Sequence, residues 1–257
     1  METVSENRSY EGVQGVYRHS SSSTGTEMTF SVFVPPHARG ATLPVVWYLS
    51  GLTCTHANVT EKGEFRKACA ELGLIFVAPD TSPRGENVPD DPAGAFAFGL
   101  GAGFYVDATQ DPFSTHYHMW NYVTEELPGI IGEHFPADMN RQSIMGHSMG
   151  GHGALTIGLT FPERFKAVSA FSPIVAPSAV PWGQKALTGY LGPQGESWRK
   201  HDAVALIEDG AHLPDLLVDQ GEADQFLAEQ LRPELLAAAC AKAGIPLELR
   251  MQPGYDH

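Results

Sequence analysis

From Pro44 onward, short apolar runs alternate with segments of helical spacing, and this rhythm constrains the fold more than any other feature. PVVWYL at Pro44–Leu49 and LIFVA at Leu74–Ala78 are continuous apolar runs, typical of strands buried on both faces. Between them, Glu64–Leu72 has helical spacing and ends at Gly73. Further strands are expected at Gln142–Met145, Phe165–Phe171, Leu216–Gln220 and Leu247–Met251, and further helices at His116–Phe135, Gly150–Leu159 and Phe226–Ala243.

Alternating strands and helices predict an α/β fold, with a mostly parallel central sheet and helices on both of its faces. Gln14–Arg18 and Met28–Val34 also have strand character. No linker divides the chain, so we expect one domain over residues 1–257, with an irregular flap near 173–212 that contains short helices. Residues 81–115 are rich in Gly, Pro and Asp, and loops of this length are usually functional. Proteins with such sheets bind their ligands at the carboxyl ends of the strands.

The charge and the cysteines limit the class of protein. The formal net charge is −14, which argues against nucleic acid or an anionic membrane as a partner, because both need clustered Lys and Arg. The three cysteines, Cys54, Cys69 and Cys240, form no disulfide framework and no C-x-x-C pair. Neither a secretory signal nor an apolar stretch of membrane-spanning length is visible. We therefore expect a cytoplasmic protein with reduced thiols.

The stretch Gly146-His147-Ser148-Met149-Gly150 matches the G-x-S-x-G motif of serine hydrolases. A short apolar strand is predicted before it and a helix rich in small residues after it, which is the setting of a nucleophile elbow. In such an elbow the serine occupies a sharp turn at a helix N-terminus, where backbone N–H groups favour negative charge. Ser148 is therefore the predicted nucleophile.

A serine hydroxyl needs a base, and the base needs an orienting carboxylate that follows the serine in the chain. The strand at Leu216–Gln220 leads into three candidates. Asp219 lies within the strand and should point to a sheet face, whereas Glu222 and Asp224 lie in the loop beyond it. We favour Asp224, with Glu222 as the alternative; Asp224 could also cap the helix that follows.

The base is expected after the last strand, and His257 stands there, beyond a Pro-Gly loop. His147 and His152 are too close to the serine along the chain, and the remaining histidines precede Asp224. The oxyanion hole needs two backbone N–H donors. Met149, next to the nucleophile, is one, and Leu52 or a neighbour in the loop after PVVWYL is the other. The Gly99–Gly103 run is not a dinucleotide fingerprint, because its sixth position is Phe104 and no strand precedes it.

Several long motifs together resemble the S-formylglutathione hydrolase, or esterase D, family: "LSGLTCTHANVTEKGEFRKACAELGLIFVAPDTSPRG", "FGLGAGFYVDATQDPF", "GHSMGGHGAL", "PWGQKALTGYLG", "DQGEADQFL" and "QPGYDH". The resemblance covers the chain from about residue 10 to its end. It implies an α/β-hydrolase fold and hydrolysis of S-formylglutathione to glutathione and formate, a step of formaldehyde detoxification, with activity on small activated esters. It places Ser148, Asp224 and His257 in the triad, and Leu52 and Met149 at the oxyanion positions.

The same resemblance implies a pocket with Cys54 beside the active site and Trp182 in its wall, and we add His147, which flanks the serine. It implies a cytosolic homodimer that needs no metal or cofactor. Family members continue past the "GYDH" histidine, whereas this sequence stops at His257.

Several alternatives stay open at this point. Cys54 is either a modifiable thiol or an inert buried residue, and Trp182 belongs either to the pocket or to the core of the flap. Lys185 is a weak candidate for binding the anionic glutathione. The chain could instead be a general short-chain carboxylesterase, or a scaffold that only binds.

Overall fold

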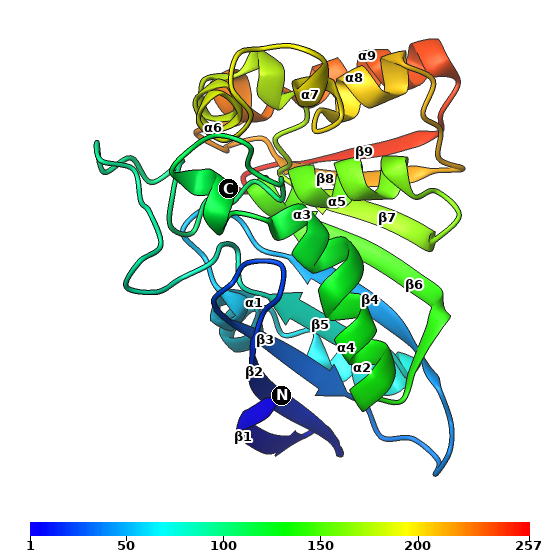
Figure 1. Cartoon of the computed structure of the whole chain (residues 1–257). Coiled ribbons are helices and arrows are strands. Elements are labelled where there is room, and N and C mark those ends of the chain that lie inside the picture. Colours follow the sequence, from blue (N-terminus) through cyan, green and yellow to red (C-terminus); the bar gives the residue numbers. More distant parts are fainter.

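A nine-stranded sheet runs through the whole protein in the computed structural model, which describes residues 1–257 (Figure 1). The strands are β1 (Glu2–Ser9), β2 (Gly12–Ser20), β3 (Glu27–Val34), β4 (Leu43–Leu49), β5 (Ile75–Pro79), β6 (Ala137–His147), β7 (Phe165–Phe171), β8 (Leu216–Gly221) and β9 (Leu247–Gln252). Their order across the sheet is β1-β2-β3-β5-β4-β6-β7-β8-β9. The first strands pair antiparallel, and every pair from β5 to β9 is parallel.

Helices occupy most of the connections between the strands. The α-helices are α1 (His56–Lys62), α2 (Arg66–Leu72), α3 (Met119–Asn121), α4 (Leu127–His134), α5 (Met149–Thr160), α6 (Pro181–Leu191), α7 (Glu196–Arg199), α8 (Ala203–Glu208) and α9 (Pro233–Ala243). Short 3₁₀ segments lie at η1 (Phe113–Thr115) and η3 (Pro177–Ala179), and π-helical segments lie at η2 (Tyr122–Glu126) and η4 (Leu227–Leu231). No helix is both long and apolar enough to cross a membrane.

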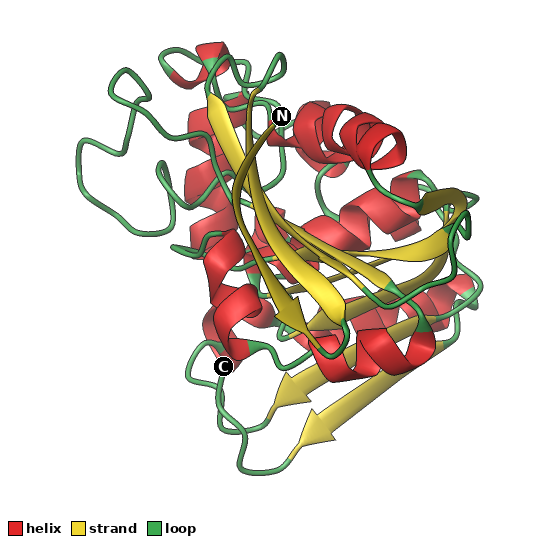
Figure 2. Ribbon diagram, turned by 90° about the horizontal axis from the view of Figure 1, so that it is seen from below, coloured by secondary structure: helices red, strands yellow, loops and turns green.

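Helices cover both faces of the sheet (Figure 2). Alternate residues of the buried strands enter two separate cores, one on each face. Val46 and Phe76 face a small cluster with Val59 of α1 and Cys69 of α2. Their neighbours in β4 and β5 face the large cluster, which α4, α5, α8 and α9 complete on the opposite face. Successive side chains of a strand point to opposite faces, so a strand with both faces covered reads as one apolar run. The predicted mostly parallel α/β sheet is confirmed.

Register brings the ends of the central strands together. In the parallel pair of β4 and β6, Leu49 lies opposite Gly146. The loop that begins at Ser50 and the turn at Ser148 therefore leave the sheet side by side. The chain segments that follow β8 and β9 leave at the same edge, because these strands run parallel to β6.

Some predicted elements differ from the observed ones. The helix expected at 116–135 is divided, because the π-helical η2 separates α3 from α4. The helix expected at 226–243 is interrupted at Arg232, which has φ 52° directly before Pro233. β1 and α1 were not predicted. Residues 173–212 hold η3, α6, α7 and α8, and are more helical than the irregular flap that we expected.

Candidate active site

Ser148 occupies a strained turn between β6 and α5. Its backbone has φ 57° and ψ −118°, a conformation that non-glycine residues rarely adopt. The Ser148 N–H donates to the carbonyl of Phe171 at 2.9 Å, which ties the turn to the end of the neighbouring strand β7. Met149 is the first residue of α5, so its own N–H has no acceptor within the helix. The side chain of Ser148 thus projects from a helix N-terminus, in the geometry of a nucleophile elbow.

Close backbone packing fixes this turn. A Cβ atom at Gly150 would lie 1.8 Å from the Leu49 carbonyl oxygen, so only glycine allows α5 to approach the end of β4. All of α5 except Thr160 is buried. The small residues after Ser148 therefore let the helix start directly against the sheet.

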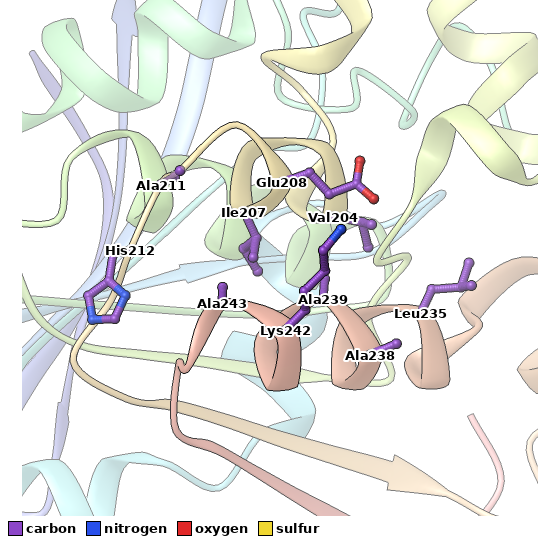
Figure 3. Close-up of a pocket in the computed structure, with 11 residues that line it drawn as sticks. Val204, Ile207, Glu208, Ala211, His212, Leu235, Ala238, Ala239, Lys242 and Ala243 are labelled. Atoms are coloured by element: carbon purple, nitrogen blue, oxygen red, sulfur yellow. The ribbon is translucent and has the colours of Figure 1, made fainter.

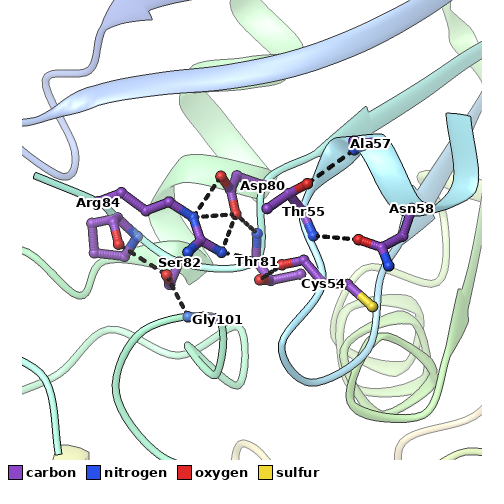
Figure 4. Close-up of polar contacts among 10 residues, drawn as sticks. Cys54, Thr55, Ala57, Asn58, Asp80, Thr81, Ser82, Arg84 and Gly101 are labelled. Carbon is purple, nitrogen blue, oxygen red and sulfur yellow. Dashed lines mark hydrogen bonds and ion pairs between the residues drawn. The ribbon is translucent and has the colours of Figure 1, made fainter. Parts of the chain in front are cut away.

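The loop after β4 is braced by the segments that surround it (Figure 4). The Thr53 N–H donates to the Gly101 carbonyl at 2.9 Å. The Cys54 carbonyl accepts hydrogen bonds from the Thr81 hydroxyl and the Arg84 guanidinium, and Arg84 also pairs with Asp80. The Leu52 N–H has no acceptor in the protein. The Gly101 carbonyl thus helps to hold a loop in which the amides of Gly51 and Leu52 are free of protein acceptors.

Asp224 and His257 are hydrogen-bonded to each other. The Nδ1–H of His257 donates to Asp224 Oδ2 at 2.7 Å, and the Asp224 carboxylate is fully buried while His257 remains 21% exposed. Asp224 also accepts from the Phe226 N–H at 2.8 Å and from Gln220 Nε2 at 3.1 Å. Because Nδ1 is held by the carboxylate, Nε2 is the ring nitrogen of His257 that can accept a proton from an alcohol.

The other carboxylates near β8 do not reach the imidazole. Asp219 forms an ion pair with Arg250 of β9, so it points to a sheet face as its place within the strand predicts. The Glu222 side chain is exposed. Asp224 is thus the carboxylate that the fold brings to His257, and its bond to the Phe226 N–H shows that it caps the following turn as well.

Backbone contacts hold the loop that carries His257. The Ala223 N–H donates to the Tyr255 carbonyl at 2.9 Å, and the Glu222 N–H donates to the Gln252 carbonyl at 3.1 Å. A Cβ at Gly221 would lie 2.3 Å from the Asp256 carbonyl oxygen, so the two loops touch backbone to backbone. The loop after β9 is therefore anchored on the loop after β8, and His257 is brought to the buried Asp224.

Ser148 and His257 line the same cavity, whose volume is ≈ 260 Å³. The loop from Gly51 to Cys54 forms one wall of this cavity and three aromatic residues, Phe96, Trp182 and Phe226, form another. Trp182 contacts both other rings, with centroids 5.4 Å from Phe96 and 4.7 Å from Phe226. The expected pocket residues Cys54, His147 and Trp182 all lie on this cavity. Phe96 and Phe226 were not predicted: Phe96 lies in none of the quoted motifs, and Phe226 lies in DQGEADQFL without any sign that it faces the cavity.

His147 is the second imidazole of the cavity. Its ring centroid lies 4.6 Å from that of His257, and no hydrogen bond to protein engages its nitrogens. Burial lowers the pKa of His147 to about 4, and the neighbouring His257 contributes in the same direction. His147 is therefore uncharged at neutral pH, and it adds no positive charge beside the base.

Cys54 borders the cavity as a half-buried free thiol, whereas Cys69 and Cys240 are buried elsewhere. Burial raises the pKa of the Cys54 thiol; the Gly51 backbone and the charge of Lys62 act in the opposite direction. Lys185, the candidate for glutathione binding, forms an ion pair with Asp91 and has no free charge to offer.

Size alone would point elsewhere, because a hollow of ≈ 660 Å³ bordered by η2, α4 and β6 is larger, and it holds no hydroxyl or thiol nucleophile. A hollow of ≈ 520 Å³ lies between α8 and α9, and Figure 3 shows it lined by aliphatic and alanine side chains. Glu208, His212 and Lys242 are its polar residues, and it holds no hydroxyl or thiol nucleophile. No group of three or more His, Cys, Asp or Glu side chains is arranged to hold a metal ion. The smaller cavity at Ser148 is therefore the candidate active site.

Comparison with known proteins identifies the family of the chain. Residues 21–257 match the model of a family described as putative esterase. An S-formylglutathione hydrolase from Paracoccus denitrificans is 53% identical over 100% of this chain and 91% of the relative, and one from Mus musculus is 46% identical over 100% and 92%. A solved structure of an S-formylglutathione hydrolase from Agrobacterium tumefaciens is 58% identical, with a TM-score of 0.98 over 100% of this chain and 92% of that one.

Proposed function

The chain belongs to the S-formylglutathione hydrolase family, which has the α/β-hydrolase fold, and on that premise we propose that it hydrolyses the thioester S-formylglutathione to glutathione and formate. Ser148 is the nucleophile, His257 the general base and acid, and Asp224 the residue that orients the imidazole. The observation that carries the proposal is the 2.7 Å hydrogen bond from His257 to the buried Asp224, at the cavity that Ser148 also lines.

The reaction begins when His257 Nε2 takes the proton of the Ser148 hydroxyl and the oxygen attacks the formyl carbon. The negative charge that develops on the carbonyl oxygen is stabilised by the N–H groups of Leu52 and Met149, both free of protein acceptors. Loss of one such donor costs about 10²–10³ in kcat in other hydrolases. Collapse of the intermediate breaks the C–S bond, and the thiol leaves with the proton from His257.

The second half of the reaction releases the formyl group. A water molecule gives its proton to His257 Nε2 and attacks the formyl-Ser148 ester. Collapse of this intermediate returns the proton from His257 to the Ser148 oxygen and frees formate. Throughout, Asp224 keeps the proton on His257 Nδ1 and stabilises the imidazolium when it forms.

The cavity also suits small esters, because aromatic rings line one wall and its volume is only ≈ 260 Å³. A general short-chain carboxylesterase is accordingly the alternative. Comparison of kcat/KM for S-formylglutathione and 4-nitrophenyl acetate separates the two. We expect the thioester to be the better substrate, and a clear preference for the ester would reject the proposal.

Ser148→Ala tests the nucleophile directly. We expect it to lower kcat by about 10⁶, the size of the loss in a comparable serine hydrolase. It should also abolish labelling by a fluorophosphonate probe, which a non-catalytic binding scaffold would never show. Ser143→Ala, five residues earlier on β6, is the matched control, and it should keep the wild-type kcat and the labelling by the probe.

We further propose that the protein needs no metal or cofactor, because a serine triad performs this chemistry unaided. The three unpaired cysteines support a cytoplasmic location. The role in formaldehyde detoxification follows from the proposed substrate. Residues 1–257 act as one domain, with Trp182 of the 173–212 flap in the cavity wall. The active form is a homodimer, which light scattering coupled to size-exclusion chromatography tests.

A further inference from the structure

Gln220 lies behind the hydrogen-bonded pair of Asp224 and His257. It belongs to β8, it is fully buried, and it does not line the cavity at Ser148. Its amide nitrogen donates to Asp224 Oδ2 at 3.1 Å and to the Gly221 carbonyl at 3.2 Å. Both partners are acceptors, so the amide turns its nitrogen, and not its oxygen, toward the carboxylate. Gln220 thus contacts a residue of the proposed triad without itself reaching the cavity.

Asp224 Oδ2 accepts two hydrogen bonds at once. It accepts from His257 Nδ1 at 2.7 Å as well as from the Gln220 amide, whereas Oδ1 accepts from the Phe226 N–H at 2.8 Å. Donors on both oxygens hold the plane of the carboxylate. A hydrogen bond to a carboxylate also stabilises its negative charge. The Gln220 amide therefore competes with the imidazole of His257 for the charge of the same oxygen.

A second buried glutamine shows what is particular to Gln220. Gln14 of β2 donates to the carbonyl of the next residue, Gly15, at 3.2 Å, as Gln220 does to that of Gly221. In both glutamines Oε1 is buried without a partner, which costs stability in either place. The two residues differ in their second acceptor, which is the Val32 carbonyl for Gln14 and a carboxylate for Gln220. The bond to the carboxylate is therefore the feature that needs a functional explanation.

We propose that Gln220 is a positioning residue of the triad, which holds the Asp224 carboxylate and limits how strongly that carboxylate binds the His257 imidazolium. This inference rests on the proposed function, because it assigns a role within the same triad. An imidazolium that is held too tightly stays protonated at neutral pH and cannot accept the proton of Ser148. Gln220 takes no part in the bond-breaking steps and acts through Asp224.

Other ionisable groups also lie near the imidazole of the base. His147, at the end of β6, has its ring centroid 4.6 Å from that of the base, and Cys54 of the loop after β4 lines the same cavity. Asp256 precedes the base in the chain and is exposed. Gln220 forms hydrogen bonds with none of these groups. A substitution at position 220 therefore reaches the imidazole through the Asp224 carboxylate.

The pH dependence of kcat/KM separates this role from a structural one. Its acidic limb follows the loss of a proton from the imidazolium of the free enzyme. Gln220→Met keeps the length of the side chain but removes the donor, so the imidazolium is held more tightly. The midpoint of the acidic limb should therefore move to higher pH by about 0.5–1 unit. Gln220→Glu replaces the donor with a negative charge and should move the midpoint further.

The plateau above this limb reports the second part of the role. Without the Gln220 amide, the carboxylate loses one charge-assisted hydrogen bond that fixes its plane. We expect kcat/KM on the plateau to fall about ten-fold in Gln220→Met.

Gln14→Met is the matched control. It removes an equivalent pair of hydrogen bonds from a buried amide and should lower the melting temperature about as much as Gln220→Met, with an unchanged pH profile. If Gln220 serves folding alone, both variants keep the wild-type midpoint, and that result would overturn the assignment. Gln220→Glu, which keeps the shape of the side chain, provides the same test where the methionine variant does not fold.

The choice of substrate keeps this test apart from that of the proposed function. The profiles are measured with 4-nitrophenyl acetate, which needs the same triad, and with S-formylglutathione. If wild type hydrolyses both and Gln220→Met leaves the acidic limb in place, the role of Gln220 is wrong while the proposed function stands. If wild type hydrolyses only the ester, the proposed substrate is wrong, and the ester profiles still decide the role of Gln220.

Discussion

Ser148 and His257 reach one cavity from two regions that are built in different ways. The nucleophile region lies at the centre of the sheet, and its geometry depends on backbone atoms in contact, such as Gly150 against the Leu49 carbonyl. The acid–base region follows β8 and β9 at the edge of the sheet, where Tyr255 is 69% exposed. Backbone contacts hold its two loops together, but the position of the imidazole depends on hydrogen bonds to one buried carboxylate, that of Asp224. The comparison teaches that substitutions should damage folding in the first region and catalysis in the second.

Asp224→Asn tests the acid–base region and has the largest expected effect. The amide cannot hold the proton on His257 Nδ1 as a carboxylate does, so kcat for S-formylglutathione should fall by about 10⁴. The melting temperature should stay near that of wild type, because asparagine can still accept from the Phe226 N–H. Glu222→Gln, two residues away and exposed, is the control and should keep kcat within about two-fold. Equal losses in both variants would contradict our assignment.

Gly150→Ala tests the nucleophile region. A methyl group 1.8 Å from a backbone oxygen forces α5 away from β4, so we expect the free energy of unfolding to fall by about 3 kcal/mol. Urea denaturation followed by circular dichroism measures it. Gly129→Ala, at an exposed position of α4 where a Cβ meets nothing within 4 Å, should be neutral or slightly stabilising. If Gly150→Ala unfolds at the wild-type urea concentration, close backbone packing is not what holds the elbow.

His147→Asn probes the border of the two regions and has the smallest expected effect. The pKa of His147 is lowered to about 4 in the folded protein, so between pH 6.5 and about 4 the unfolded chain binds more protons at this residue. Stability should therefore fall as the pH falls through this window. Asparagine does not titrate, so the fall in the variant should be smaller, by about 1–2 kcal/mol. Urea unfolding of wild type and variant at pH 7 and pH 4.5 provides the comparison. Identical decreases in the free energy of unfolding would show that His147 does not contribute to its pH dependence.

The sequence predicted the strands that carry an apolar pattern and missed β1, which carries none. β7 has the predicted bounds, Phe165–Phe171, and the apolar run of β4 differs from the observed strand by one residue. β1 is polar except for Val4, and nearly all of it is exposed. It becomes a strand by pairing with β2 across a turn at Tyr10 and Glu11, both with positive φ. Such a turn usually carries Asn or Gly, so no local signal marked it.

For the candidate site, residues within motifs were predictable and contacts between segments were not. The G-x-S-x-G motif selected Ser148, and chain order then selected His257 and limited the acid to Asp224 or Glu222, because the carboxyl ends of parallel strands meet at one edge. The preference for Asp224 over Glu222 agrees with its bond to His257. Phe96 and Phe226 could not be found in this way, because their place in the cavity follows from packing against Trp182.

The cavity at Ser148 is lined by residues from Gly51 to His257, so most of the chain separates its first wall from its last. During synthesis, the early segments leave the ribosome long before the imidazole is made. A nascent chain therefore has an elbow without a base and cannot turn over substrate. Recovery of esterase activity after dilution from denaturant should accordingly be the last signal to return, later than the ellipticity of the helices. Enzyme activity in this protein is a readout of completed long-range folding.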